Sequence, residues 1–166
     1  ADLGAEVIKV ERPGTGDEAR KHGPFPNDNP DLEQSGLFLA LNTNKLGITL
    51  NLDTSDGRDI LKKLLKDADV FVENNEPKYM EELGLDYASL ERINPRLIMA
   101  SITPFGQSGP YRDYKAYDIN CAAAGGVSIG IGDPEREPLA LPLSQGGYQA
   151  GVSTASAILA ALFARE

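Results

Sequence analysis

The sequence contains no tryptophan, one cysteine and one histidine among its 166 residues. A single cysteine, Cys121, excludes a disulfide within the chain, and we expect a reducing, cytoplasmic location. The histidine, His22, falls in a segment rich in turn residues, where we expect it at the surface. The start of the chain has no secretory pattern, and no apolar run has the length of a membrane span. We also expect no metal ion as a cofactor.

Positive charge is scarce, because 16 basic residues stand against 25 acidic ones and give a net charge of -9. Such a surface repels polyanions, so nucleic acid and anionic membranes are not expected as partners. A small anionic ligand remains compatible with this net charge, because its binding depends on nearby cationic side chains and backbone N–H donors. The length and the 41% hydrophobic content suit one soluble domain with a core.

The sequence patterns at both ends of the chain indicate secondary structure that normally has further elements beside it. The first residues, ADLGAEVIKVE, read as a helix end, a glycine stop and a strand, and such a helix packs on a preceding strand. The last residues, LFARE, close a helical pattern. We therefore expect the natural protein to extend both ways, with its first strand and its C-terminal part outside residues 1–166.

Strand and helix patterns alternate along the chain. Strand patterns cover residues 5–11, 47–52, 68–73 and 96–103. Helical patterns cover residues 36–41, 53–65, 77–84, 87–93, 117–124 and 151–165. The alternation predicts an α/β fold with a Rossmann-like, mostly parallel sheet flanked by helices. Ligands of such sheets bind beyond the carboxyl ends of the strands, which selects residues 11–12, 73–75 and 103–106 as the rim of a site.

Four segments carry residue types suited to an anionic ligand. They are VIKVERPGTGDEAR with Arg12, NTNK with Lys45, VENNEP with Asn74 and Asn75, and FGQSGPYRDYKAYD with Lys115, Tyr117 and Asp118. Arginine and lysine bind phosphate at strand ends, and free backbone N–H groups before a helix favour an anion.

Each of these residues also has an ordinary structural interpretation. Arg12 can form a surface salt bridge, and Lys45 can be a solvated loop lysine. Asn74 or Asn75 can cap the next helix, and Asp118 can simply complement a helix dipole. The residue types alone therefore leave both interpretations open.

The order and spacing of the segments are more specific than any one of them. LGAEVIKVERPGTGDEAR, NTNKLGITLNL, ADVFVENNEP, LGLDYASLERINPRLIMASITPFGQSGPY, YD and ILAALFARE resemble successive motifs of the family III CoA-transferases, over essentially all 166 residues. That family includes formyl-CoA transferase, the carnitine CoA-transferases and the α-methylacyl-CoA racemases. The resemblance implies part of the family's large Rossmann-like domain, and a full chain that interlocks with a second one into a dimer.

The resemblance also implies a CoA site and a reaction centre. The residues that match CoA contacts by motif position are Arg12, Lys45, Asn74, Leu83 and Lys115. Tyr117 and Asp118 match a pair beside the reaction centre. The chain departs from the family at Asn75, where an aromatic or apolar residue is usual, and at Glu82, where a basic residue is common.

The largest departure is a missing carboxylate. In the family an aspartate before the last helix attacks the acyl-CoA carbonyl, and the matching position here is Gly147 or Gly146. Glycine has no side chain and cannot act as a covalent catalyst. Asp118 is the nearest candidate replacement, whereas Ser144 has no adjacent base in the sequence. Racemase members also need a histidine where Tyr117 stands.

The leading hypothesis is a CoA-transferase-like protein that moves CoA between an acyl-CoA and a carboxylic acid. Two versions stay open, namely one half of a fused or heteromeric enzyme whose other half supplies the aspartate, and a non-catalytic CoA-binding or assembly subunit. A generic nucleotide-binding domain that uses NAD is an alternative of another class. The absence of a GxGxxG motif speaks against it.

Overall fold

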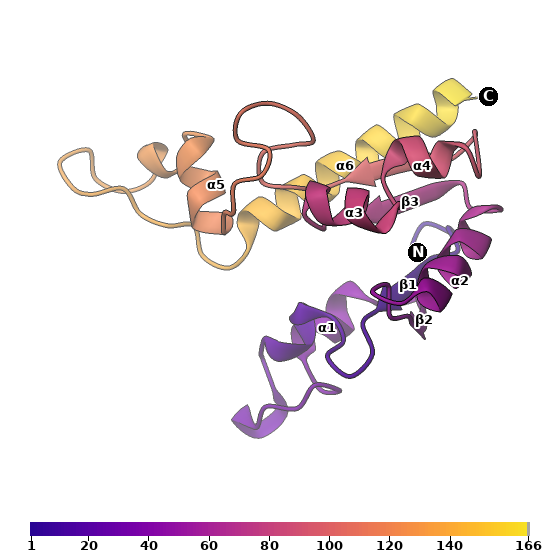
Figure 1. The fold of residues 1–166 in the computed structure, drawn as a ribbon. Helices are drawn as coiled ribbons and strands as arrows, with labels where there is room; N and C mark the ends of the chain where they lie inside the picture. The colour runs from indigo at the N-terminus through magenta and orange to yellow at the C-terminus, as the bar shows by residue number, and fades with distance from the viewer. Residues whose placement is uncertain (166) are drawn as a thin grey trace. The chain divides into compact units, whose positions relative to one another are not determined.

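The computed structural model describes residues 1–165, and Glu166 lies outside the described residues. The chain divides into two compact units, Ala1–Lys63 and Leu64–Glu166, each of which is described by itself. Figure 1 shows strands alternating with helices along the chain. Both strand pairs are parallel, which confirms the α/β fold and the parallel pairing predicted from the sequence.

The first unit is built on one parallel strand pair, in which Glu11 at the end of one strand lies opposite Thr49 at the end of the other. The strands and helices of this unit are β1 (Ile8–Glu11), η1 (Glu18–Lys21), η2 (Pro26–Asp28), α1 (Gly36–Leu41) and β2 (Leu46–Thr49). After β2 comes α2 (Ser55–Leu65), which continues across the boundary between the units. The strands are shorter than the patterns predicted, but they lie where the patterns place them.

Ser35 fixes the long loop between β1 and α1, and its side chain is fully buried. Its hydroxyl oxygen lies 2.7 Å from the carbonyl oxygen of Ala19 and 2.6 Å from that of His22. The same oxygen accepts a hydrogen bond from the backbone N–H of Phe38 at 3.1 Å and so caps α1. His22 itself is exposed, as the sequence predicts.

The second unit contains the other strand pair, with Glu73 opposite Ser101 at the strand ends. Its strands and helices are β3 (Val70–Glu73), α3 (Pro77–Leu83), α4 (Tyr87–Glu91), β4 (Ile98–Ser101), α5 (Asp118–Ala124), η3 (Ser128–Gly130) and α6 (Gln145–Arg165). Figure 1 shows α6 running beside this strand pair, and α6 contacts β4. The buried apolar side chains of the unit are Leu65, Met80, Leu85, Leu90, Leu97 and Ala122.

Local chemistry sets the ends of α3 and α4. Pro77 occupies the first turn of α3, and Gly84 ends that helix with a left-handed φ of 63°. Asp86 then accepts a hydrogen bond from the N–H of Ser89 and caps α4. The side-chain amide of Asn94 donates to the carbonyl oxygens of Leu65 and Ala68, at 3.0 and 2.9 Å. Asn94 thereby connects the segment before β4 to the residues that follow α2 and precede β3.

Helix α6 begins at Gln145, so the prediction that it starts at Gly151 after the glycine pair is wrong. The pair Gly146–Gly147 lies in the first turn of the helix. The helix extends this far because Asp118 satisfies one of its free N–H groups, accepting from the N–H of Gly147 at 3.1 Å. A partner remote in sequence thus offsets the low helix propensity of two glycines.

Within the described residues, α6 is the one helix that is long and apolar enough to cross a membrane, with a mean hydropathy of 1.2. That finding corrects the expectation that no segment has the length of a span. None of this window is buried in the structure. The core helix of a soluble protein meets the same criteria of length and composition.

Candidate functional site

A partly buried ion pair organises the carboxyl end of β1. Glu11 accepts from the Nε and Nη2 atoms of Arg20 at 2.7 and 3.0 Å, and from the backbone N–H of Asp17 at 2.9 Å. The guanidinium carbon of Arg20 lies 3.7 Å from the ring centroid of Phe38. A second ion pair joins Lys9 to Asp17. The loop after β1 is therefore held by fixed charges.

The same contacts shift the pKa values of the acids. The hydrogen bond from Arg20 lowers the pKa of Glu11, against an opposing effect of burial, and Glu11 in turn raises the pKa of Arg20. Burial pushes the pKa of Asp17 upward, but hydrogen bonds from Lys9 and from the N–H of Ala19 outweigh it and leave that pKa lowered. Both carboxylates are thus stabilised as anions.

Acid is expected to weaken the first unit through Glu11. Because the pKa of Glu11 is lowered by folding, its stabilisation is complete above about pH 4.3, the usual glutamate value, and is lost as the pH falls through the lower folded-state pKa. Denaturation of the full-length protein along an acid series checks this. Glu11→Gln should flatten the acid limb of the stability curve, and identical limbs in the two proteins would contradict the assignment.

Arg12 directly follows Glu11 in the sequence but takes no part in these ion pairs. Its side chain is exposed, and no described acid forms an ion pair with it. The surface salt bridge that the sequence left open is therefore not observed. The Arg12 guanidinium is available to an anion from outside the unit.

Lys45 is more constrained than a solvated loop lysine. Its Nζ atom donates to the carbonyl oxygen of Leu41 at 2.8 Å and to Oδ1 of Asn42 at 3.0 Å. Burial, followed by the charge of Lys9, lowers its pKa. A desolvated ammonium near a second cation favours the approach of an anion.

The end of β3 differs from the sequence prediction in one respect. Glu73 is buried, and its Oε2 atom accepts from the backbone N–H of Asn75 at 2.7 Å and lies 3.4 Å from the Asn75 side-chain nitrogen. The N-cap of α3 is Glu76, so neither asparagine caps that helix. Asn74 is exposed. Of the two asparagines, Asn74 is the more exposed and Asn75 is half-buried.

The remaining predicted contacts lie on α3 and in the loop after β4. Leu83 is half-buried at the end of α3, and Glu82 is exposed. Lys115 is also exposed, with its Nζ atom 3.3 Å from Oε1 of Glu76. Such an exposed pair contributes little to stability, so an anionic ligand can replace Glu76 as the partner of Lys115.

Asp118 joins the start of α5 to the start of α6. It is the first residue of α5, and its Oδ1 atom accepts from the N–H of Gly147. Tyr117, directly before it, is 82% exposed. The carboxylate therefore does more than complement the dipole of its own helix, since it also caps the neighbouring one.

Gly146 and Gly147 differ in the space that is available for a side chain. A Cβ atom at Gly146 would stand 2.5 Å from Oδ1 of Asp118, whereas the nearest atom to one at Gly147 is Cβ of Ser144, at 3.8 Å. A side chain at Gly146 would displace the Asp118 carboxylate. A side chain at Gly147 fits without that cost.

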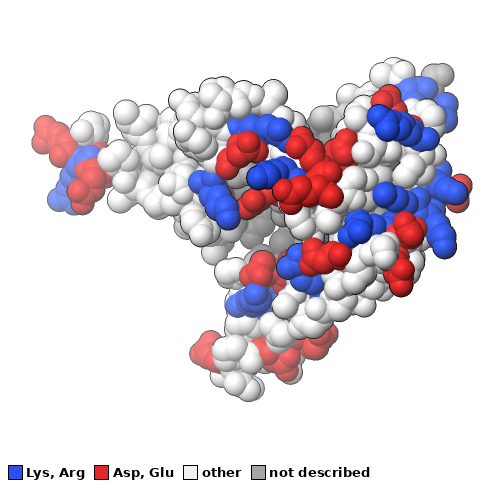
Figure 2. Space-filling model, in the orientation of Figure 1, with Lys and Arg blue, Asp and Glu red and all other residues white. Residues whose placement is uncertain are grey.

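The predicted site residues fall into two groups. Arg12 and Lys45 belong to the first unit, and the second unit contains Asn74, Leu83, Lys115, Tyr117, Asp118 and the glycine pair. Over the part of the chain that is described, no group of three or more metal-ligating side chains occurs. Figure 2 shows both acidic and basic side chains on the face in view, and several of the acidic ones lie next to one another.

Two important side chains were missed from the sequence. Arg20, rather than Arg12, makes the structural ion pair, and Glu73 is buried at the end of β3. Both residues stand in segments that were selected, but polar residue type alone does not separate a buried anchor from an exposed ligand contact. The preference of serine for helix N-caps could have identified Ser35, which precedes the apolar run GLFLAL.

Comparison with known proteins places this fold in a family. The sequence model of CoA-transferase family III matches residues 1–166. The chain belongs to that family, as its motifs indicate.

Curated relatives with named activities are similar over the whole chain. An acetyl-CoA:oxalate CoA-transferase from Acetobacter aceti is 41% identical over 166 residues, which is 99% of this chain and 41% of that protein. A formyl-CoA:oxalate CoA-transferase from Escherichia coli is 39% identical over 164 residues, covering 99% of this chain and 38% of the relative. The chain thus spans about two fifths of the length of these relatives.

Solved structures agree with this assignment. A CAIB/BAIF family protein from Brucella suis superposes with a TM-score of 0.85 at 38% identity, over 99% of this chain and 43% of that one. Rv3272 from Mycobacterium tuberculosis gives a TM-score of 0.84 at 38% identity, over 99% and 45% of the two chains. The fold is therefore shared with experimentally determined members.

Proposed function

We propose that the full protein moves CoA between an acyl-CoA and a carboxylic acid. The observation that carries this proposal is the identity of 41% and 39%, over 99% of this chain, with two named CoA-transferases. The names of both relatives contain oxalate, so acetyl-CoA or formyl-CoA with oxalate are the substrates to test first. We further propose a cytoplasmic protein whose full chain forms an interlocked dimer.

Each of the two units by itself presents side chains suited to part of a CoA molecule. CoA is a polyanion, and Arg12, Lys45 and Lys115 present cations that are exposed or held in place by carbonyl groups. Asn74 and Leu83 add an accessible amide and a half-buried apolar surface at the end of β3 and on α3. In this proposal the cations bind the phosphates of CoA, through charge-assisted hydrogen bonds.

CoA transfer through an enzyme carboxylate requires a defined sequence of bonds. A carboxylate oxygen attacks the thioester carbonyl carbon, the C–S bond breaks, and CoA leaves as a thiolate. The thiolate then attacks the enzyme carbonyl of the resulting anhydride, which releases the first acid as its carboxylate. The acceptor carboxylate reverses these two steps and leaves with CoA, so the enzyme carboxylate is regenerated.

This chain brings one carboxylate to the start of α6, and that is Asp118. Its Oδ1 atom is held by the N–H of Gly147, and no described residue donates to Oδ2. Three versions of the function follow: transfer with an aspartate supplied by another half of the enzyme, transfer through Asp118, and CoA binding without catalysis. The first is the version that we favour among catalytic ones, because Asp118 is already engaged as a helix cap.

A transfer assay separates these versions. Full-length protein is incubated with acetyl-CoA or formyl-CoA and oxalate, and the CoA esters are separated by liquid chromatography. New CoA ester in the wild type supports an enzyme, and its loss in Asp118→Asn but not in Asp113→Asn assigns the reaction to Asp118. Absence of transfer by a protein that binds CoA leaves the non-catalytic version.

Arg12→Ala is expected to weaken CoA binding by about 10-fold or more, because a hydrogen bond to a charged group contributes about 1.5–3 kcal/mol. The exposed side chain has no ion-pair partner among the described residues, so its removal should leave the melting temperature unchanged. Calorimetric titration with CoA measures the effect, with Arg136→Ala as an exposed arginine control. Equal affinities in all three proteins would remove Arg12 from the site.

A further inference from the structure

The loop between β4 and α5 has no helix or strand of its own over residues 104–116. Its backbone hydrogen bonds, from the N–H of Arg112 to Gly109 at 3.3 Å and from that of Tyr114 to Tyr111 at 2.9 Å, close turns inside the loop. Within the described residues, no backbone hydrogen bond ties this stretch to a neighbouring strand or helix. Side-chain contacts therefore set the position of the loop.

Three aromatic rings fold the loop onto itself. The ring centroids of Phe105 and Tyr111 lie 5.9 Å apart, and the ring of Tyr114 lies 6.4 Å from the first and 5.2 Å from the second. These separations are typical of interacting aromatic pairs. The early and late parts of the loop are thereby joined, with Arg112 between Tyr111 and Tyr114 in the sequence.

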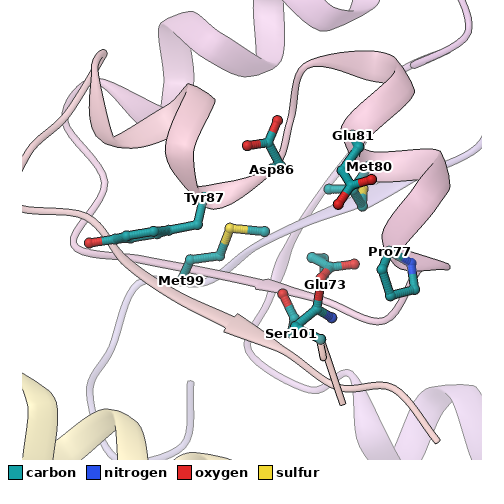
Figure 3. A pocket seen from close by; sticks show the side chains of 9 residues that line it. Glu73, Pro77, Met80, Glu81, Asp86, Tyr87, Met99 and Ser101 are labelled. Carbon is teal, nitrogen blue, oxygen red and sulfur yellow. The ribbon is translucent and has the colours of Figure 1, made fainter. Parts of the chain in front are cut away.

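Arg112 connects this folded loop to α3. Its guanidinium forms an ion pair with Glu81 of that helix, and the Arg112 side chain is 25% exposed, with its Nε atom buried. Glu81 and Gln107 of the loop also line one hollow, in which Figure 3 shows Glu81 beside Met80 of the same helix. The loop and α3 thus lie side by side, and a partly buried ion pair joins them.

Lys115 follows Arg112 by three residues and reaches the N-terminal end of α3. Its Nζ atom lies 3.3 Å from Oε1 of Glu76, the N-cap residue of α3, and its side chain is 83% exposed. An exposed ion pair of this kind contributes little stability, so it does not fix the lysine by itself. Asn74 precedes Glu76 by two residues, so this end of α3 carries two of the proposed CoA contacts.

We propose that Arg112 is a positioning residue for CoA binding. By pairing with Glu81 it holds the loop against α3, and so keeps the Lys115 ammonium at the N-terminal end of that helix for a phosphate of CoA. Arg112 acts through Lys115 rather than on CoA itself, because its guanidinium is already engaged by Glu81. The inference rests on the proposed function, since it assigns a role inside the proposed CoA site.

Calorimetric titration of the full-length protein with CoA tests this role through a double-mutant cycle. Arg112→Ala should weaken CoA binding by about 5-fold or more, whereas the same change in a Lys115→Ala background should cost less than about 2-fold, because the effects of residues that act as a unit are not additive. Arg112→Lys keeps a cation that can pair with Glu81, so it should lose less affinity than Arg112→Ala.

Glu81→Ala separates positioning from general electrostatics. Removal of an acid near an anionic ligand would strengthen binding by charge alone, but loss of the Arg112 partner should weaken it by about the same factor as Arg112→Ala. The Glu81 side chain is 52% exposed, so we expect this variant to fold. Glu91→Ala is the matched control, because this exposed acid of α4 contacts Tyr87 rather than the loop, and it should leave the affinity unchanged.

The possible results separate the positioning role from the proposed function. Equal losses from Arg112→Ala in the two backgrounds, an unchanged affinity in Lys115→Ala, or tighter CoA binding in Glu81→Ala would each overturn the positioning role while the protein still binds CoA. A wild-type protein that does not bind CoA would overturn the proposed function, and this role with it.

Discussion

If no other part of the enzyme supplies the aspartate, Gly147→Asp in the full-length protein is expected to raise CoA transfer by at least about 10²-fold over the wild-type background. Loss of a catalytic nucleophile costs up to ~10⁶-fold in a well-evolved enzyme, and a restored one in an untuned setting should recover part of that. The structure has room for the side chain, since the nearest atom to a Cβ at Gly147 is 3.8 Å away. Liquid chromatography of the CoA esters measures the gain.

Gly146→Asp provides the matched control, because it adds the same group one residue earlier. There the new Cβ would stand 2.5 Å from Oδ1 of Asp118, so the variant must displace the cap of α6 and should gain no activity. The two variants together test both the position and the chemistry. If neither gains activity while CoA still binds, the idea of a frame that lacks only its nucleophile is wrong.

Arg20→Ala is expected to be the most destabilising single change in the first unit, at about 2–4 kcal/mol. The substitution leaves Glu11 without its bidentate partner, with side-chain exposures of 16% for Arg20 and 9% for Glu11. It also removes the contact with the ring of Phe38 and the hydrogen bond to the carbonyl oxygen of Leu32. Chemical denaturation of the full-length protein measures the loss.

Two comparisons make this result specific to the geometry of Arg20. Arg20→Lys keeps the charge but not the paired N–H donors, so it should recover less than half of the loss. Arg12→Ala removes a neighbouring exposed arginine and should leave stability unchanged. A loss in Arg12→Ala equal to that in Arg20→Ala would mean that net charge, rather than the Glu11 contact, stabilises the loop.

The positions of the strands could be predicted from the sequence, because their apolar residues recur between clear turn signals. The bounds of β3 fall within two residues of the predicted segment, and those of β2 within three, and both pairings are parallel as expected. The start of α6 could not be predicted. Two glycines signal a break when considered locally, and the carboxylate that stabilises them comes from Asp118, 29 positions earlier.

The site residues show the same division between local and long-range information. The sequence selects the segments at the strand ends, and in the structure Arg12 and Asn74 are exposed there. The sequence cannot show that Arg20 contacts Glu11, or that Asn75 contacts Glu73, because both contacts depend on the path of a loop. The burial of Glu73 likewise leaves no trace in a residue pattern.

The most direct test of the CoA-binding frame is calorimetric titration of the full-length wild-type protein with CoA and, separately, with NAD. The account predicts saturable binding of CoA, weakened by added salt because cations contact its phosphates, and no binding of NAD. Binding of NAD without binding of CoA would contradict it, and would assign the parallel strand pairs to a nucleotide-binding domain of another kind.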